Sequence, residues 1–329
     1  MEMEQIRFSG RFDFNDARGP RFAWSGCTIL VRFQGTSISV RLKSHGENYL
    51  LVLLDGRVIQ NALRVTDERE YTLAASLKEG PHEISLVRRN EFYFGSIQFL
   101  GFHVTGGGLL ALPPPSDKKI EIIGDSITCG FGNEGAMGME YHQRYDNAYL
   151  SYAAIASRLL EAECHIIGYS GFGIIRDYLG NEQNTLPAKY DFIIPEENTP
   201  WGFDTWIPQL VGINLGTNDF GFGTTPDREQ FTAAYVNFIK RIRGHYPNAH
   251  ILCIVGTTMG GKALETIRTY IQEDIIRLLS NSGFKQISYL ELEQQKEEDK
   301  LGISGHPGVR THQIAGRRLY EEIKRLMNW

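Results

Sequence analysis

The sequence is poor in the features that define several specialised classes of protein. It has few cysteines, and none of them forms a CxxC pair of the kind that binds zinc. Its histidines occur without an HxH or HExxH motif, and no cluster of carboxylates accompanies them. We therefore expect no catalytic metal and no disulfide. We interpret the four cysteines as small, reduced residues of the core: Cys27, Cys129, Cys164 and Cys253.

Excess charge and long apolar runs are also missing. The net charge of −5 is small for 329 residues, and Lys and Arg are scattered among the acids. This pattern argues against a nucleic acid or an anionic membrane as partner. No stretch approaches the roughly 20 continuous apolar residues that a membrane-spanning helix needs. The Gly-rich segments lack a P-loop lysine and a GxGxxG after the first strand, so we expect no nucleotide cofactor.

The first residues, MEMEQIRFSGRFDF, have neither the basic start nor the apolar core of a signal peptide. Together with reduced cysteines, this predicts a cytoplasmic protein, or a secreted one if the sequence begins at a mature end. No oligomeric state is predicted.

Two regions of different pattern divide the chain, as its length suggests. Residues 1–108 show short alternating segments rich in β-branched and aromatic residues, separated by turn signals and without a helical period. They predict a β-sandwich of jelly-roll type. Gly106 to Gly108 end this region, and a linker at 109–117 contains the triproline Pro113 to Pro115.

Strands and helices alternate in the second region, 118–329. This alternation predicts a doubly wound α/β domain, with a parallel sheet and helices on both faces. The expected strands are Ile120 to Ile123, Cys164 to Ile167, Leu210 to Leu215, Ile251 to Val255 and Gln286 to Leu290. The expected helices are Asn147 to Ala162, Asp227 to His245, Ala263 to Ser280 and Thr311 to Met327. The apolar face expected of the first helix contains Tyr149, Tyr152, Ile155, Ala156 and Leu159.

Three polar residues stand beside the ends of predicted strands and helices, where a catalytic group can be exposed. Ser126 comes directly after the first strand of the second region, at the sheet edge where open α/β sheets place ligands. Asn218 follows a second strand, and His306 stands just before the last helix. A hydroxyl, an amide and an imidazole supply a nucleophile, an oxyanion donor and a general base. Cys129 is a weaker rival for the nucleophile, because no histidine motif points to it.

Four sequence blocks carry a family resemblance: GDSITCGFG, GYSGFG, NLGTND and HPGVRTH. In this order they resemble the SGNH (GDSL) hydrolase superfamily, and most closely carbohydrate esterase family two, which also has a β-rich domain before the hydrolase domain. The resemblance implies a serine esterase with Ser126 and His306 as catalytic residues. The implied oxyanion hole consists of the Ser126 and Gly171 backbone N–H groups and the Asn218 side chain.

The sequence departs from the superfamily pattern beside the base. An Asp usually stands three residues before the His and orients it, whereas here that position is Ile303. We therefore predict a Ser–His dyad in which a backbone carbonyl orients His306. A carboxylate from Glu297, Glu298 or Asp299 is the alternative. His312, the nearest other histidine, is expected to pack within the last helix.

The expected substrate is an acetylated carbohydrate, and the expected reaction is removal of O-acetyl groups through an acetyl-serine intermediate. Trp201 and Trp206 lie in a long connection and are candidate sugar-binding residues, because aromatic faces suit sugar rings. A general short-chain acylesterase or lipase-like enzyme is the second hypothesis. The third is a carbohydrate-binding protein with a vestigial hydrolase domain.

Overall fold

The computed structural model describes residues 3–329, which form two compact units. The first unit extends to Pro115 and includes the distant segment Phe192–Pro200. The second contains Ser116–Asp191 and Trp201–Trp329. Part of the predicted linker belongs to the first unit, because its first two residues pair in strand β11 (Gly108–Leu110).

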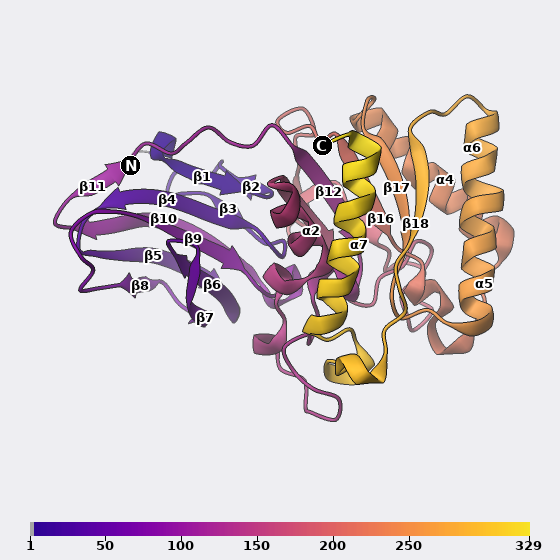
Figure 1. Ribbon diagram of the computed structural model, residues 1–329, viewed down its shortest axis with the longest axis horizontal. Coiled ribbons are helices and arrows are strands. Elements are labelled where there is room, and N and C mark those ends of the chain that lie inside the picture. Colours follow the sequence, from indigo (N-terminus) through magenta and orange to yellow (C-terminus); the bar gives the residue numbers. More distant parts are fainter. Residues whose placement is uncertain (1–2) are drawn as a thin grey trace. The chain divides into compact units, whose positions relative to one another are not determined.

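The first unit consists mainly of two antiparallel sheets, as predicted for a jelly-roll-like β-sandwich (Figure 1). In the first sheet β11 pairs with β4, and the order is β1 (Ile6–Ser9), β4 (Thr28–Gln34), β9 (Pro81–Arg88), β6 (Asn48–Leu54), β7 (Arg57–Val65). In the second the order is β2 (Phe12–Asp13), β3 (Arg21–Phe22), β10 (Ser96–Thr105), β5 (Ser37–His45), β8 (Arg69–Ala74). Two short 3₁₀ helices, η1 (Met3–Gln5) and η2 (Phe92–Phe94), and the hairpin β14 (Phe192–Ile194) and β15 (Thr199–Pro200) complete the unit.

Alternating side chains produce the sandwich interior. In β4, Ile29, Val31 and Phe33 are fully buried, and the residues between them are half-buried. Because successive side chains of a strand point to opposite faces, this places one apolar row inside the unit. The alternation of apolar and polar residues in the sequence therefore predicts this strand correctly.

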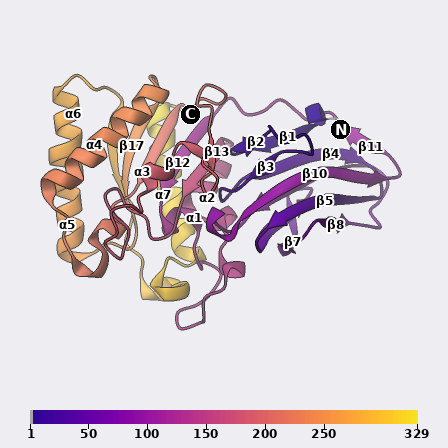
Figure 2. The same ribbon diagram turned by 180° about the vertical axis from the view of Figure 1, so that it is seen from behind.

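The second unit is built on a five-stranded parallel sheet, with helices on both faces (Figures 1 and 2). Its order is β13 (Glu163–Gly168), β12 (Lys119–Gly124), β16 (Leu210–Asn214), β17 (His250–Val255), β18 (Ile287–Glu291). The α-helices are α1 (Ser126–Cys129), α2 (Tyr152–Leu160), α3 (Leu186–Lys189), α4 (Arg228–His245), α5 (Gly261–Thr269), α6 (Arg277–Asn281) and α7 (Val309–Met327). The 3₁₀ helices are η3 (Gln143–Tyr145), η4 (Ala148–Leu150), η5 (Thr217–Gly223), η7 (Glu297–Asp299) and η8 (Ile303–Gly305), and η6 (Tyr270–Ile276) is a π-helix.

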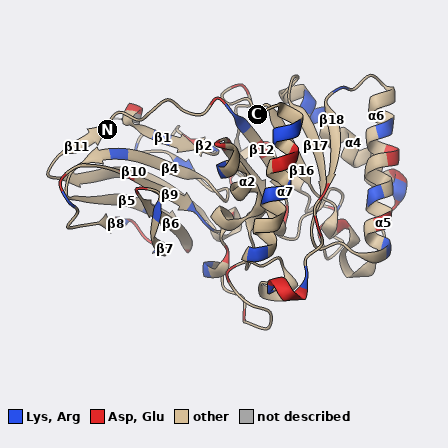
Figure 3. Ribbon diagram, in the orientation of Figure 1, with Lys and Arg blue, Asp and Glu red and all other residues tan. Residues whose placement is uncertain are grey.

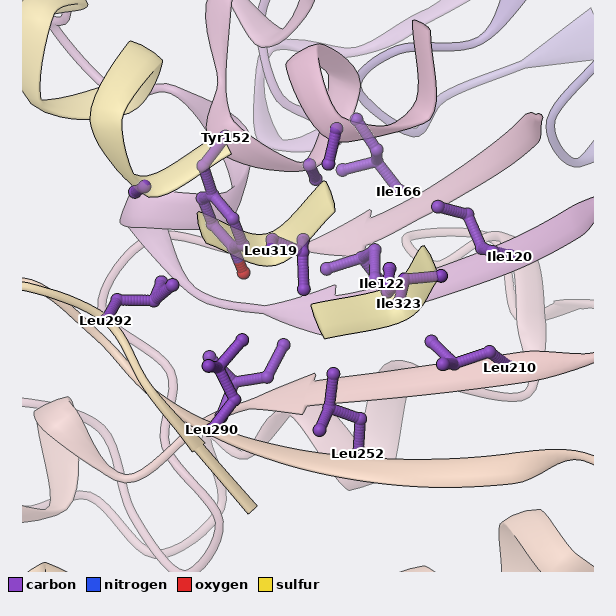
Figure 4. Packing of buried hydrophobic residues seen from close by; sticks show 14 of the residues in the cluster. Ile120, Ile122, Tyr152, Ile166, Leu210, Leu252, Leu290, Leu292, Leu319 and Ile323 are labelled. Carbon is purple, nitrogen blue, oxygen red and sulfur yellow. The ribbon is translucent and has the colours of Figure 1, made fainter. Parts of the chain in front are cut away.

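Helices α2 and α7 cover one face of this sheet. Leu319 and Ile323 of α7 belong to the same buried cluster as Ile122 of β12, and Figure 4 shows them lying together. The doubly wound prediction is thus confirmed, and the crossover at β12 brings the carboxyl ends of β12, β13 and β16 to one edge.

Charged residues of both signs are interspersed along the ribbon of each unit (Figure 3), in keeping with the small net charge. Among residues 3–329, no helix combines the length and the apolar character needed to cross a bilayer.

The buried face of α2 differs from the one expected. The helix is shorter than predicted, and its buried residues include Ala153, Ser157 and Leu160, whereas Leu159, predicted to be on the apolar face, is 47% exposed. Ser151 caps the helix, its hydroxyl accepting from the Ala154 N–H. The cap fixes the starting residue and hence the rotation of the helix, which periodicity alone did not provide.

Two adjacent leucines give a matched test of this packing. Leu160→Ala removes a side chain that is 3% exposed in the core cluster, and we expect it to lower the free energy of unfolding by about 2–5 kcal/mol. Leu159→Ala should change it by no more than about 0.5 kcal/mol. Urea denaturation of both variants measures the difference, and equal losses would contradict the assigned helix face.

Candidate active site

The candidate nucleophile stands at the first residue of helix α1, where β12 ends. Asp125 caps this helix, because its Oδ1 accepts the Ile127 N–H at 3.0 Å. Gly124 must be a glycine, since a Cβ there would lie 2.0 Å from Thr128 Oγ1. This tight turn holds Ser126 at the sheet edge, with 7% of its surface exposed.

Ser126 and His306 lie together although 180 residues separate them in the chain. The distance from Ser126 Oγ to His306 Nε2 is 3.0 Å. His306 Nδ1 lies 3.2 Å from the Ile303 carbonyl oxygen. A carbonyl oxygen only accepts, so Nδ1 carries the proton and Nε2 is left to accept from the serine hydroxyl. This is the tautomer that a general base for Ser126 requires.

A main-chain carbonyl occupies the place where the superfamily pattern has a carboxylate. Within residues 3–329, the hydrogen bonds of the His306 ring are those to Ser126 and Ile303. Glu297 and Glu298 are exposed on η7 and make no hydrogen bond to the ring. The side chain of Ile303 is buried, and a Cβ at Gly132 would lie 2.8 Å from its Cβ.

The surroundings of His306 favour its neutral form. Burial lowers the pKa of the imidazole below its usual value, and the hydrogen bond to the Ile303 carbonyl offsets part of this effect. Phe131 contacts the ring with a centroid distance of 4.5 Å and stacks in turn on Tyr141, 4.5 Å away. Phe131 belongs to the GDSITCGFG block, but no sequence pattern indicated that it would support the histidine.

Asn218 and Gly171 come from neighbouring loops of the same sheet edge. Asn218 Nδ2 donates to the Phe172 carbonyl at 2.9 Å and approaches Asp125 Oδ2 at 3.4 Å. Gly171 has φ +84°, a conformation that favours glycine, and precedes the carbonyl that Asn218 holds. The Asn218 side chain thus connects the nucleophile turn with the Gly171 loop.

A pocket of about 340 Å³ opens over the dyad. Apolar side chains of Ile127, Phe220 and Met259 contribute to it beside the polar groups, and Gly171 is not among its lining residues. The full lining is Ser126, Ile127, Thr217, Asn218, Phe220, Thr258, Met259, Gly260, Ala263, Ser304, Gly305 and His306.

The two tryptophans predicted to bind sugar lie elsewhere. Trp206 stacks on His165 with a centroid distance of 3.5 Å, and only 8% of it is exposed. Trp201 meets the edge of the same imidazole, and Lys119 at the start of β12 lies 5.9 Å from the Trp206 ring. Neither indole lines the pocket, because their loop packs toward the amino end of β12.

His312 packs as expected, but it also has a polar role. Its Nδ1 accepts the Tyr152 N–H at 3.2 Å, and burial lowers its pKa to about 3. The Tyr152 hydroxyl bonds to Thr128 at 2.8 Å and accepts from Asn214 Nδ2 at 2.9 Å. This buried network joins α7 to the nucleophile helix and to the end of β16.

Known proteins resemble the chain over its whole length. Residues 8–115 match the family Carbohydrate esterase 2 N-terminal, and residues 122–314 match the GDSL-like Lipase/Acylhydrolase family. A family two carbohydrate esterase from Clostridium thermocellum, solved in complex with cellohexaose, superposes with a TM-score of 0.95 and is 39% identical, over 98% of this chain and 99% of that one. The chain belongs to carbohydrate esterase family two.

Two curated relatives of the family add detail. The cellulase/esterase CelE of Acetivibrio thermocellus is 39% identical over 98% of this chain, which spans only 40% of the length of CelE. An acetylxylan esterase / glucomannan deacetylase of Cellvibrio japonicus is 25% identical over 98% of this chain and 89% of its own length. The predicted resemblance is confirmed, and carbohydrate esterases are carboxylic ester hydrolases, as predicted for the enzyme class.

The pH dependence of ester hydrolysis tests how His306 is oriented. Because burial lowers its pKa, the acid limb of kcat/KM should have its midpoint below the ordinary value of 6.5. Alanine at Glu297, Glu298 and Asp299 together should leave the profile unchanged, whereas Ile303→Asp should move the limb to higher pH, since a carboxylate stabilises the imidazolium.

Thermal melts of both variants are the control for folding. Loss of activity in the triple alanine variant would contradict the carbonyl-oriented dyad.

Proposed function

We propose that this protein is a serine esterase that removes O-acetyl groups from carbohydrates. The observation that carries the proposal is the 3.0 Å hydrogen bond between Ser126 and His306 in a pocket at the carboxyl edge of the sheet. The names of the relatives, an acetylxylan esterase / glucomannan deacetylase among them, support the acetylated carbohydrate as substrate.

The mechanism uses the dyad twice. His306 Nε2 takes the Ser126 proton while Oγ attacks the acetyl carbonyl carbon, which gives a tetrahedral oxyanion. The Ser126 and Gly171 N–H groups and Asn218 Nδ2 stabilise that charge. When the carbon–oxygen bond to the sugar breaks, His306 returns the proton to the sugar oxygen. Water then attacks the acetyl-serine with His306 again as base, releasing acetate and restoring Ser126.

Asn218 must change partners to act in this way. In the structure its amide donates to the Phe172 carbonyl at 2.9 Å and approaches Asp125 Oδ2 at 3.4 Å, so a developing oxyanion has to take the N–H of the longer, weaker contact to Asp125 while the bond to Phe172 remains. Catalytic hydrogen bonds are often loose before substrate binds. The hydrogen bond from Asn218 to the oxyanion is therefore expected to form in the transition state and not in the resting enzyme.

Two exposed aromatic rings are better candidates for sugar contact than the tryptophans. Tyr178 is 48% exposed and Phe222 is 79% exposed, and their centroids lie 6.1 Å apart. Tyr178 also adjoins the oxyanion loop, since its N–H bonds the Gly171 carbonyl at 2.9 Å. Exposed aromatic faces beside a catalytic loop suit the apolar faces of sugar rings.

The first unit offers less to a sugar. The outer side of its second sheet carries a network of salt bridges, in which Arg18 and Arg41 both pair with Glu68. Ser39 on the same strand as Arg41 bonds Glu70. Such a self-paired polar surface opposes the hypothesis that the β-sandwich alone does the work, as does the assembled dyad.

Hydrolysis of p-nitrophenyl esters separates the three hypotheses. Ser126→Ala should lower kcat by several orders of magnitude without loss of folding, because the dyad acts as a unit. Acetyl should be preferred to longer acyl chains if the enzyme is a deacetylase, whereas a general acylesterase should accept both. A Ser126→Ala protein with full activity would refute the esterase mechanism.

Acetylated polysaccharide tests the aromatic pair. Tyr178→Ala should raise KM for acetylated xylan or glucomannan, because remote contacts mainly contribute ground-state binding. Its kcat/KM for p-nitrophenyl acetate should stay close to that of the parent. Tyr93→Ala is the matched control, since Tyr93 is an exposed aromatic of the first unit. A raised KM in the Tyr93 variant alone would move sugar binding to the β-sandwich.

A further inference from the structure

Asp219 is a buried carboxylate that the dyad does not use. It follows Asn218 directly and is inaccessible to solvent. Its Oδ1 accepts the Ile175 N–H at 2.8 Å, and its Oδ2 accepts the Ile174 N–H at 2.9 Å. A buried carboxylate that accepts several backbone N–H groups fixes the conformation of the segment that donates them.

The segment so held is the loop that carries Gly171. Asn218 Nδ2 bonds the Phe172 carbonyl, and Arg176 Nε returns to the Asp219 carbonyl at 3.0 Å. Asn218 and Asp219, consecutive residues of η5, therefore bond both ends of the stretch from Phe172 to Arg176. We call this set of hydrogen bonds the clamp. Gly173 lies inside this clamp, because a Cβ there would come within 2.3 Å of Asp219 Oδ2.

We propose that Asp219 is the positioning residue of the oxyanion hole, whose carboxylate holds the Gly171 loop in register with Asn218. The inference rests on the proposed esterase function. Gly171 and Asn218 reach the site from different strands, β13 and β16, and donors that stabilise an oxyanion must be fixed before the charge develops. Asp219 fixes the position of the Gly171 loop relative to the loop that carries Asn218.

The protonation state of Asp219 provides a readout that is specific to this role. Burial raises its pKa to about 6, against the lowering effect of the N–H bonds and of Arg176. Within residues 3–329, the ionisable groups that face Asp219 include Tyr235 of α4, whose own pKa is raised well above its usual value, and Asp125 across the Asn218 amide. Because the N–H bonds lower the pKa of Asp219, they are stronger to the ionised carboxylate than to the protonated group, so a protonated Asp219 holds the loop less well.

Loss of the clamp in acid is separable from unfolding. The folded-state pKa of Asp219 is raised above the usual 3.8, so between these values the folded state binds a proton that the unfolded state does not. This group therefore stabilises the fold more, not less, as pH falls through that range. If protonation of Asp219 lowers the activity, that loss is therefore not caused by unfolding due to Asp219, because its protonation stabilises the folded state in this pH range.

The experiment compares Asp219→Asn with the parent enzyme across pH, with p-nitrophenyl acetate as substrate. Well above pH 6, kcat/KM should fall by about 10²-fold, as for loss of an oxyanion donor. Well below pH 6 the ratio of parent to variant should approach one, because the parent is itself protonated at Asp219. Protonation of His306 lowers kcat/KM at acid pH in both proteins, so its effect cancels in this ratio.

Glu121→Gln is the matched control, since Glu121 is a buried acid of the same unit that accepts from the Tyr190 hydroxyl at 2.6 Å. It should leave kcat/KM unchanged even if its melting temperature falls. Gly173→Ala tests the clamp with the carboxylate intact and should lower kcat/KM on both sides of pH 6. A ratio for Asp219→Asn that is independent of pH, or a loss matched by Glu121→Gln, would overturn the proposal; activity in Ser126→Ala would instead overturn the esterase function.

Discussion

The bond from His306 Nδ1 to the Ile303 carbonyl is the contact on which the rest of the site depends. A main-chain acceptor can orient a ring only if the main chain itself is held. Here the Gly302 N–H bonds the His306 carbonyl at 2.8 Å, and Gln295 Nε2 donates to the Gly305 carbonyl at 2.7 Å. Ser304 has φ +55°, an uncommon value outside glycine that this turn imposes. The turn thus replaces a carboxylate by a fixed dipole.

This replacement changes the electrostatics of the base. A carboxylate beside an imidazole stabilises the charged form, whereas a carbonyl offers only a partial charge. His306 is also half-buried and packed against Phe131, and its burial lowers its pKa. The base is then neutral and ready over a wider acid range, while the imidazolium formed during the reaction gains less stabilisation. The oxyanion side of the site consequently has to supply a larger share of the transition-state stabilisation.

Sequence reasoning succeeded where a residue follows a strand of a parallel sheet. Ser126, Gly171 and Asn218 all follow strands, and the carboxyl ends of neighbouring parallel strands meet by construction. The absence of the acid could be read directly at Ile303. The position of Trp201 and Trp206 away from the pocket could not be predicted, because a long loop has no periodicity that fixes which way its side chains point. Trp206 found His165 as a stacking partner, which no local pattern indicated.

The two acidic side chains of the site bond to its loops and not to His306. Asp125 caps the nucleophile helix through the Ile127 N–H, and Asp219 binds two N–H groups of the Gly171 loop. Backbone N–H groups offset part of the cost of burying these two carboxyl groups, although for Asp219 burial outweighs them and raises its pKa. A carboxylate on His306 would add another acidic group to this site. Orientation by the Ile303 carbonyl avoids that addition, and the two acidic groups that are present hold the nucleophile helix and the Gly171 loop in place.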